Sequence, residues 1–410
     1  MHVAFITDQI PRPNRAGYLA YNHALISGLA DRGHDVTIVL AGQRLSAPII
    51  AYANDYDLDR VRVVGRGLMS FRGRVALRPI RDWARSLARG ALGVMPGGIG
   101  ERLRRRAWSM AHGHVDGVIG RFLSAPEARF AASLAAPADL VMADTIFRAP
   151  ALPYVCGRKR HAILTHDVFH ARHAALSARG MELIPRSLTE ADEAALLRTA
   201  GLLIAIQHRE ADELRRLAPD ARVVTAPMPA QLSPRPKTLA REAGRLVYLG
   251  SGTPHNIDGM RWFLDEVWPR LVRQRPGLRL DLVGGIGAVL GAPPAGVTVH
   301  GLVEALGPIL HRASLAIAPQ LAGSGQSIKL IEYAAHGLVT VTTAAAVAGY
   351  DEDGARPFVV ADSADDFAAV VAELAASDGS DREAAALAYA RRFQAATVLR
   401  PLFEEIEAAA

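Results

Sequence analysis

Cysteine, lysine and long apolar runs are scarce in this sequence of 410 residues, and each scarcity excludes a class of protein. A single cysteine, Cys156, excludes an internal disulfide bond and a cysteine-rich metal site. No run of about 18 apolar residues occurs, so the sequence predicts no transmembrane helix. The N-terminal segment contains Asp8 and Arg12 and lacks the apolar middle of a signal peptide, so we expect a cytoplasmic protein.

The basic residues are almost all arginines, and they gather in one part of the chain. Lysine supplies only three of the 47 basic residues. Between Arg60 and Arg106 there are 13 arginines and two acids, Asp82 and Glu101. Because this excess is larger than the net charge of +6 of the whole chain, the other residues are mildly acidic. A confined basic patch predicts a local anionic partner, such as a membrane surface, rather than general binding of nucleic acid.

Strand-like apolar runs alternate with helix-like stretches, which is typical of α/β proteins with parallel, doubly wound sheets. Near the N-terminus, residues 2–7 and 35–40 predict buried strands on either side of a helix that ends at Gly33. The proline-rich stretch 227–237 predicts a linker, and a strand at 245–250 restarts the alternation.

This organisation predicts two Rossmann-like domains. We expect the first at residues 1–228, with a basic insertion at about 60–130, and the second at residues 229–385. A C-terminal helix at 386–410 should return to the first domain.

A glycine-serine loop near residue 324 precedes an expected helix and is the most informative motif. The loop contains Gly323, Ser324 and Gly325, and Lys329 and Glu332 follow in the helix. Such a loop offers backbone N–H groups and the positive end of the helix dipole to a phosphate. Lys329 would add positive charge, and Glu332 would accept hydrogen bonds from ribose hydroxyls. An ordinary solvated loop is the alternative interpretation.

This segment resembles the nucleotide-sugar site of retaining glycosyltransferases of family 4, also called glycosyl transferases group 1, which have the GT-B fold. The resemblance extends over both domains except at about 45–135. The residues and stretches that carry it are Pro319, Gly323, Ser324, Gly325, Lys329, Glu332, Ala334, Ala335, Gly337, Val339, LADRGHDVTIV (29–39), THDVFHARH (165–173), VYLGSGTPHNIDGMRWFLDEVWPRL (247–271) and VTVHGLVEALGPIL (297–310).

The resemblance implies two domains that face a cleft and a hexosyltransferase activity, with retention of configuration. It implies a nucleoside-diphosphate sugar, with UDP or GDP, as donor, and a glycan or lipid-linked acceptor, as in polysaccharide biosynthesis. No cofactor and no metal are expected. The residues that it implies for binding the nucleotide sugar are Gly17, Gly250, Ser251, Gly252, Asn256, Gly301, Val303, Gly323, Ser324, Gly325, Lys329 and Glu332.

The sequence departs from the family pattern at two places. Many members carry a glutamate where this chain has Ser324, so only Glu332 remains of the usual pair. Many also carry an arginine and a lysine in the loop that opens the second domain, whereas SGTPHN (251–256) contains neither. We therefore expect Lys329 and the amides of Ser251 and Gly252 to hold the diphosphate.

His166 and Asp167 follow an expected strand, at the sheet edge where ligands of open α/β sheets bind. The resemblance implies that His166 hydrogen-bonds the donor sugar, so both residues are candidate catalytic residues, with Asp167 as a general base if the reaction inverts. A structural hydrogen-bonding pair is the alternative. A metal site formed by His166, His170 and His173 is discounted, because the segment begins at a strand end.

The arginine patch includes a stretch, 79–92, that would place Trp83 on the apolar face of a helix opposite several arginines. Such a helix can rest on an anionic membrane, and packing on the first domain is the alternative. The residues assigned to this membrane or acceptor patch are Arg78, Arg81, Trp83, Arg85 and Arg89.

Two other functions fit the same residues. One is a sugar-nucleotide 2-epimerase of the same fold, and the other is a non-catalytic protein that binds a nucleotide sugar or a polyanion.

Overall fold

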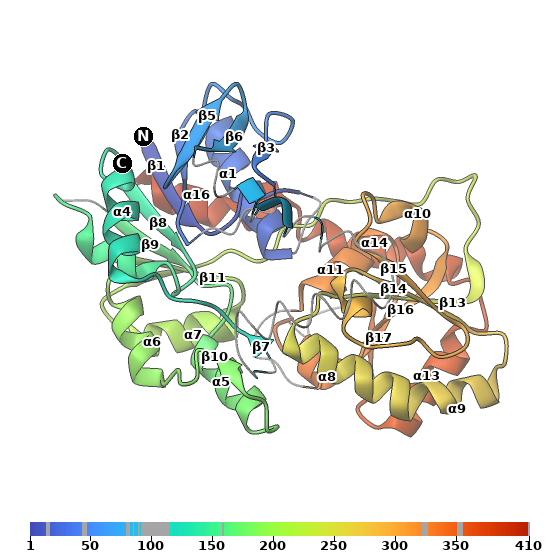
Figure 1. Ribbon diagram of the computed structural model, residues 1–410. Coiled ribbons are helices and arrows are strands. Elements are labelled where there is room, and N and C mark those ends of the chain that lie inside the picture. Colours follow the sequence, from blue (N-terminus) through green and yellow to red (C-terminus); the bar gives the residue numbers. More distant parts are fainter. Residues whose placement is uncertain are drawn as a thin grey trace. The chain divides into compact units, whose positions relative to one another are not determined.

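Two parallel β-sheets organise the chain in the computed structural model (Figure 1). The first unit comprises Met1–His170, Met181–Ala226 and Pro401–Ala410, and the second comprises Ala171–Gly180 and Pro227–Arg400. The structure describes residues 1–13, 17–42, 47–78, 83–84, 86–88, 91, 115, 117–157, 160–321, 327–350 and 356–408.

Seven parallel strands form the main sheet of the first unit, in the order β12-β11-β9-β8-β1-β2-β4. The order of the strands reverses between β1 and β8, and this switch point is where ligands of doubly wound sheets bind. The strands are β1 (His2–Thr7), β2 (Asp35–Leu40), β4 (Val61–Gly65), β8 (Leu140–Asp144), β9 (Arg160–Leu164), β11 (Leu202–Ala205) and β12 (Arg222–Thr225). The helices of this unit include α1 (Gly17–Asp31), α4 (Ala125–Ala135), η1 (Ala149–Tyr154), α5 (Phe169–Ser177, which continues into the second unit), α6 (Glu190–Leu197), α7 (His208–Leu217) and α16 (Arg400–Ala408).

Six parallel strands form the sheet of the second unit, in the order β15-β14-β13-β16-β17-β18. Its switch point lies between β13 and β16. The strands are β13 (Glu242–Leu249), β14 (Arg279–Val283), β15 (Val297–Gly301), β16 (Ala313–Ala318), β17 (Thr340–Thr342) and β18 (Phe358–Val360). The helices include α8 (Pro254–Trp262), η2 (Phe263–Val267), α9 (Trp268–Gln274), η3 (Gly285–Ala288), α10 (Gly307–Leu310), α11 (Ile328–Ala335), α12 (Ala344–Val347), α13 (Ala364–Leu374), η4 (Ser380–Arg382), α14 (Glu383–Arg391) and α15 (Ala395–Val398).

Apolar side chains on both faces of the second sheet form two cores, as a doubly wound fold requires. One core contains Phe263 and Phe367, from η2 and α13, and the other contains Leu330 and Tyr389, from α11 and α14. The central strand β16 is buried along all six of its residues, whereas only the first residue of the edge strand β15 is buried. The α/β fold with two Rossmann-like sheets, expected from the sequence, is confirmed.

The segment expected as a basic insertion contributes to two sheets. Its first residues form β4 of the main sheet, and the next ones join a small antiparallel sheet, β3-β6-β5, formed by β3 (Ile49–Ala51), β5 (Leu68–Phe71) and β6 (Arg74–Leu77). A two-stranded sheet pairs β7 (Gly117–Val118) with β10 (Leu183–Ile184).

The expected C-terminal helix is divided between the units. In α14, Tyr389 and Ala390 pack in a core of the second unit. In α16, by contrast, Glu407 pairs with Arg32 at 3.1 Å, and the ring of Phe403 fills the space beside Gly28. Only α16 therefore returns to the first unit. Among the described residues, no helix is both long and apolar enough to cross a membrane.

Candidate functional site

The switch point of the second unit brings together residues that lie far apart in the sequence. Ser251 and Gly252 lie in the loop after β13, and Asn256 lies in the first turn of α8. Lys329 lies in the first turn of α11, the helix that follows β16. Because β13 and β16 are neighbours in the sheet, these elements meet at its carboxyl edge.

Asn256 joins these elements through hydrogen bonds. Its Oδ1 accepts from Lys329 Nζ at 2.7 Å and from the Tyr248 hydroxyl at 3.1 Å. Its Nδ2 donates to the carbonyl of Ser251 at 3.1 Å and to Thr253 Oγ1 at 2.9 Å. Because Asn256 is buried, this network fixes the loop after β13 relative to the Lys329 amine.

Lys329 meets neutral groups in this network. Its Nζ also donates to the Tyr248 hydroxyl at 3.1 Å and lies 4.6 Å from the centroid of the Tyr248 ring. Burial lowers the pKa of Lys329 to about 7, since neutral partners compensate poorly for lost hydration. A phosphate bound beside Nζ would favour the charged ammonium, so the site is suited to an anion.

Two glycines allow neighbouring backbone segments to pack closely at this site. A Cβ on Gly259, in α8, would lie 1.9 Å from the carbonyl oxygen of Pro319, which follows β16. Gly284, after β14, has a φ of +99°, and its Cβ would lie 2.4 Å from the carbonyl oxygen of Gly250. Glycine is therefore required at both positions for the backbones to pack this closely.

Glu332 lies one turn after Lys329 in α11, with 36% of its side chain exposed. Partial burial nevertheless raises the pKa of Glu332 to about 7. Its Oε1 lies 3.4 Å from Nδ1 of His336, whose pKa burial lowers to about 4. Nδ1 of His336 lies nearer to the backbone carbonyl of Glu332, at 2.9 Å, so the Glu332 carboxyl group keeps acceptor capacity for a ligand.

The switch point of the first unit carries a second polar network. His166 Nε2 lies 3.0 Å from Asn22 Oδ1 and 3.1 Å from Asp144 Oδ1. Thr7 donates from Oγ1 to Asp144 Oδ2 at 2.7 Å. Burial alone would raise the pKa of Asp144, but the contacts with His166, Thr7 and Asn22 outweigh it and hold the pKa below 3.8. Asp144 is therefore an ionised carboxylate that orients the His166 ring.

Backbone strain accompanies this network. Thr145, directly after β8, has a φ of +67°, and His166 has a φ of +58°. Residues other than glycine rarely adopt such angles, and each costs about 1–3 kcal/mol. Strained residues at two adjacent strand ends are typical of a functional site.

Asp167 occupies a different environment from the one expected of a general base. Its side chain is fully buried, and Oδ1 accepts from the backbone N–H of Val168 at 2.8 Å. The carboxylate that contacts His166 is Asp144, the last residue of β8, which the sequence pattern does not single out. Asn22 and Tyr248 were missed as well, because nothing in their local sequence distinguishes them from core residues.

Residues 243–377 match the family described as Glycosyl transferases group 1. These residues form a glycosyl transferases group 1 domain. The domain contains the entire Lys329–Asn256 network and Glu332. A comparison of the chain with curated proteins found no match.

Solved structures similar to the whole chain have the GT-B fold. Sucrose-phosphate synthase from Thermosynechococcus elongatus is 16% identical, with a TM-score of 0.62 over 100% of both chains. HepE from Anabaena, in complex with UDP and glucose, is 13% identical, with a TM-score of 0.62 over 100% of both chains. TarM from S. aureus is 8% identical, with a TM-score of 0.63 over 98% of both chains. At these identities the likeness shows the fold, with two Rossmann-like domains.

The other positions implied for the nucleotide sugar are less closely connected to the network. In the group 1 domain, Gly301 ends β15 with a φ of +67°, and Val303 packs against a core as a partly buried side chain. Gly17 begins α1 in the first unit. The glycine-serine loop, with Gly323, Ser324 and Gly325, lies outside the described residues.

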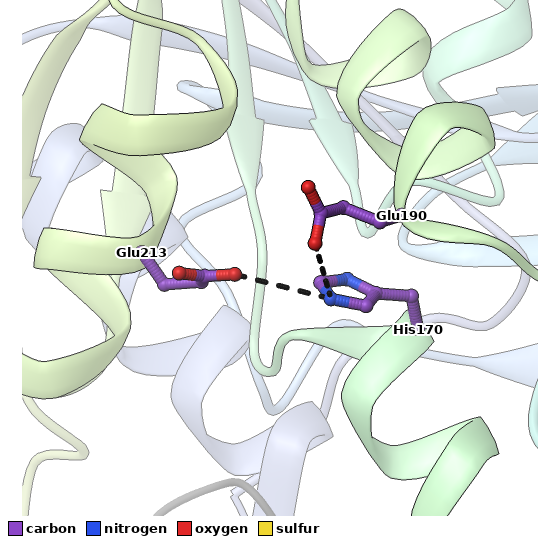
Figure 2. Close-up of side chains that lie close together, drawn as sticks. All are labelled: His170, Glu190 and Glu213. Carbon is purple, nitrogen blue, oxygen red and sulfur yellow. Dashed lines mark ion pairs between the residues drawn. The ribbon is translucent and has the colours of Figure 1, made fainter.

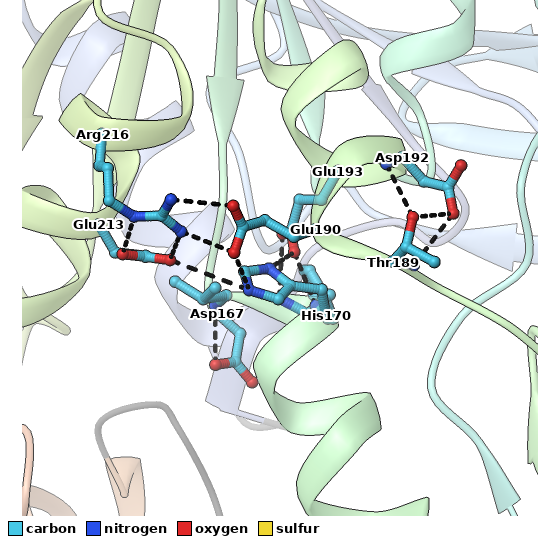
Figure 3. Close-up of polar contacts among 10 residues, drawn as sticks. Asp167, His170, Thr189, Glu190, Asp192, Glu193, Glu213 and Arg216 are labelled. Carbon is cyan, nitrogen blue, oxygen red and sulfur yellow. Dashed lines mark hydrogen bonds and ion pairs between the residues drawn. The ribbon is translucent and has the colours of Figure 1, made fainter.

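His170, Glu190 and Glu213 place three atoms of metal-ligand type within 4.8 Å of one another (Figure 2). His170 Nε2 lies 3.8 Å from Glu190 Oε2 and 3.9 Å from Glu213 Oε1. Arg216 binds the same oxygens at 2.8 Å and 2.6 Å (Figure 3). One guanidinium group therefore already pairs with both carboxylates, so the cluster is an ion-pair network in this structure.

The three histidines of the discounted metal site face different partners. His166 contacts Asn22 and Asp144, whereas His173 Nδ1 lies 3.4 Å from Ser177 Oγ. His170 belongs to the ion-pair network of α6 and α7.

Glu193, on α6, anchors the N-terminus of α5 directly after His166. Its Oε1 accepts from the Phe169 N–H at 3.0 Å, and its Oε2 accepts from the His170 N–H at 2.6 Å and from His170 Nδ1 at 2.8 Å (Figure 3). Glu193 is fully buried, and burial raises its pKa despite these hydrogen bonds. The carboxylate therefore fixes where the segment that carries His166 enters its helix.

Of the residues assigned to the membrane patch, Arg78 and Trp83 are described. The half-buried Trp83 donates from Nε1 to the carbonyl of Leu77 at 2.8 Å, so its indole lies against the end of β6. Arg81, Arg85 and Arg89 lie outside the described residues.

Proposed function

We propose that this chain is a glycosyltransferase that moves a sugar from a nucleoside-diphosphate sugar to an acceptor. The observation that carries the proposal is the Lys329–Asn256 network at the switch point of the group 1 domain. A buried lysine among neutral groups suits a diphosphate, and Glu332 one turn further suits ribose hydroxyls. The implied contacts of Ser251 and Gly252 with the diphosphate are part of the proposal.

A UDP-hexose is the first donor to test. HepE was solved with UDP and glucose. A structure described as trehalose-6-phosphate from E. coli, 12% identical with a TM-score of 0.58, was solved with UDP-2-fluoro glucose. The proposal includes membership of family 4, retention of configuration and a reaction without cofactor or metal.

Breaking the glycosidic bond to the donor phosphate leaves negative charge on the departing diphosphate. Lys329 would stabilise that charge, because its amine is already held in place by Asn256 and Tyr248. In the retaining version the leaving phosphate takes the proton of the acceptor hydroxyl, so no protein base is required. His166, oriented by Asp144, would hydrogen-bond the transferred sugar.

For the acceptor we propose a lipid-linked or other glycan, with the protein bound peripherally to the cytoplasmic face of a membrane. The excess of arginines at 60–106 supports this assignment.

Thermal shift and donor hydrolysis test the proposal together. UDP or GDP should raise the Tm of the wild type and of Lys237→Met, an exposed control lysine in the second unit, but not that of Lys329→Met. Uridine or guanosine should act equally on all three. A slow release of sugar from labelled donor should accompany binding. Binding without any turnover, including with acceptor extracts, would indicate a non-catalytic protein.

A further inference from the structure

The small antiparallel sheet of the first unit, β3-β6-β5, has an apolar inner face. Val75 in β6 is fully buried and pairs with Ile50 in β3 and Ser70 in β5. Leu68 in β5 is also buried. The sheet stands beside β4, the edge strand of the main sheet (Figure 1). This inner face therefore accounts for the packing of the small sheet on the protein.

The other face of the small sheet is apolar as well. Side chains alternate along a strand, so residues paired with one another or two apart share a face. Across the sheet Ile49 pairs with Ala76 and Ala76 with Met69, and Phe71 pairs with Arg74. The exposed fractions are 49% for Ile49, 51% for Met69 and 62% for Phe71.

Antiparallel sheets that face water normally carry polar side chains on that side. Single exposed apolar residues are common, but three large ones on one small face mark an interaction surface. We call this surface, formed by Ile49, Ala51, Met69, Phe71, Arg74 and Ala76, the outer face.

Arginines lie on and beside the outer face. Residues 60–78 contain six arginines and no acid. The guanidinium of Arg72 lies 5.1 Å from the centroid of the Phe71 ring, so charge and apolar surface are directly adjacent.

We propose that the outer face docks on an anionic phospholipid bilayer. Phe71, Met69 and Ile49 would enter the boundary between headgroups and acyl chains, and the neighbouring arginines would contact lipid phosphates. Apolar side chains with arginines directly beside them complement such a surface. The inference rests on the proposed function, since a lipid-linked acceptor requires the enzyme at the membrane, but it assigns the contact to a sheet and not to the helix expected at 79–92.

Vesicle sedimentation of the full chain tests the proposal. Wild-type protein should bind vesicles of phosphatidylglycerol and phosphatidylcholine, and should bind pure phosphatidylcholine far more weakly. Met69→Ser with Phe71→Ser should lower the partition coefficient at least about tenfold. Arg74→Gln with Arg78→Gln should lower it by roughly fivefold per arginine at low salt. The control Val299→Ser with Val360→Ser removes two exposed apolar side chains from the second unit, 38% and 41% exposed, and should bind like the wild type.

A site-specific probe separates docking from a general loss of affinity. In a Cys156→Ser background, an environment-sensitive dye on Phe71→Cys should gain intensity with anionic vesicles, and the same dye on Val360→Cys should not. Sedimentation of the serine pair within twofold of the wild type, or no signal at position 71, would overturn the proposal. If the wild type does not bind vesicles but self-associates, and the double serine variant does not self-associate, the outer face would be assigned to a second copy of the chain instead. UDP thermal shifts without vesicles test the donor site separately.

Discussion

Replacing Glu193 should damage catalysis through His166, a residue that it does not touch. The carboxylate accepts the N–H groups of Phe169 and His170 at 3.0 and 2.6 Å, and both follow His166 within four residues. His166 keeps a φ of +58°, a conformation that persists only where the surroundings enforce it. On the other side of His166, Thr165 is fixed by its N–H and Oγ1, which both donate to the carbonyl of Ile204. Glu193 supplies the corresponding restraint after His166.

The magnitude follows from the groups left without an acceptor. Glu193→Ala leaves two backbone N–H groups buried without this partner, at about 1–3 kcal/mol each, so a loss of about 2–6 kcal/mol in the free energy of unfolding is expected. Glu193→Gln retains one acceptor oxygen and should lose about half as much. The substitution also removes a restraint on the backbone of His166, whose strained conformation costs about 1–3 kcal/mol. When that strain relaxes, the orientation of the His166 ring needed for activity should become roughly tenfold less populated.

The assay therefore measures turnover of labelled donor well below the Tm, together with urea unfolding. Glu193→Gln should lower kcat about tenfold and leave UDP affinity, which we propose to arise in the second unit, within about twofold. The matched control is Glu190→Gln on the same helix, because this carboxylate is 52% exposed and solvent screens its ion pair with Arg216. If Glu193→Gln is destabilised but turns over donor like the control, Glu193 does not hold His166.

Three further outcomes are expected. Since burial raises the pKa of Glu332 from 4.5 to about 7, the contribution of Glu332 to stability in urea titrations should fall from pH 4.5 to 7, opposite to that of His336, whose pKa burial lowers from 6.5 to about 4. Since burial lowers the pKa of Lys329 from 10.5 to about 7, the contribution of Lys329 should rise from pH 7 to 10.5. Glu332→Gln should remove the fall and Lys329→Met the rise, and unchanged profiles would contradict this. Gly259→Ala should lower the Tm markedly because of the contact with the Pro319 carbonyl, whereas Gly277→Ala, with open space around it, should not. A chelator should leave turnover of the donor intact. If the chelator abolished turnover and one divalent metal restored it, the proposal of a reaction without metal would be contradicted.

The fold was predictable because its signal is local. Six-residue apolar runs such as 2–7 and 313–318 are long enough to predict buried parallel strands, and short helices between them predict double winding. The small sheet β3-β6-β5 was not predicted, since its strands are only three or four residues long and too short to show an alternation.

The candidate site was predictable only where a motif carries it. Lys329 follows a glycine-serine loop, and its position in that pattern was enough to select it. Asp144 pairs with Thr7 across 137 residues, and Asn22 contacts His166 across 144. Glu193 looks like any acid in the first turn of a helix until the fold buries it beneath α5. Such contacts arise from sheet order and not from spacing in the sequence.

The energetics of Lys329 separate a functional role from a structural one. A lysine retained for stability would be exposed or paired with a carboxylate, because burying an amine among neutral groups costs free energy. Here the pKa of about 7 shows that the fold disfavours the ammonium, so the unliganded second unit carries that cost at pH 7. Lys329→Met should therefore raise the stability of the unliganded unit at pH 7 while it abolishes stabilisation by UDP. A substitution that stabilises the empty protein and removes its ligand response is what selection for binding, and not for folding, predicts.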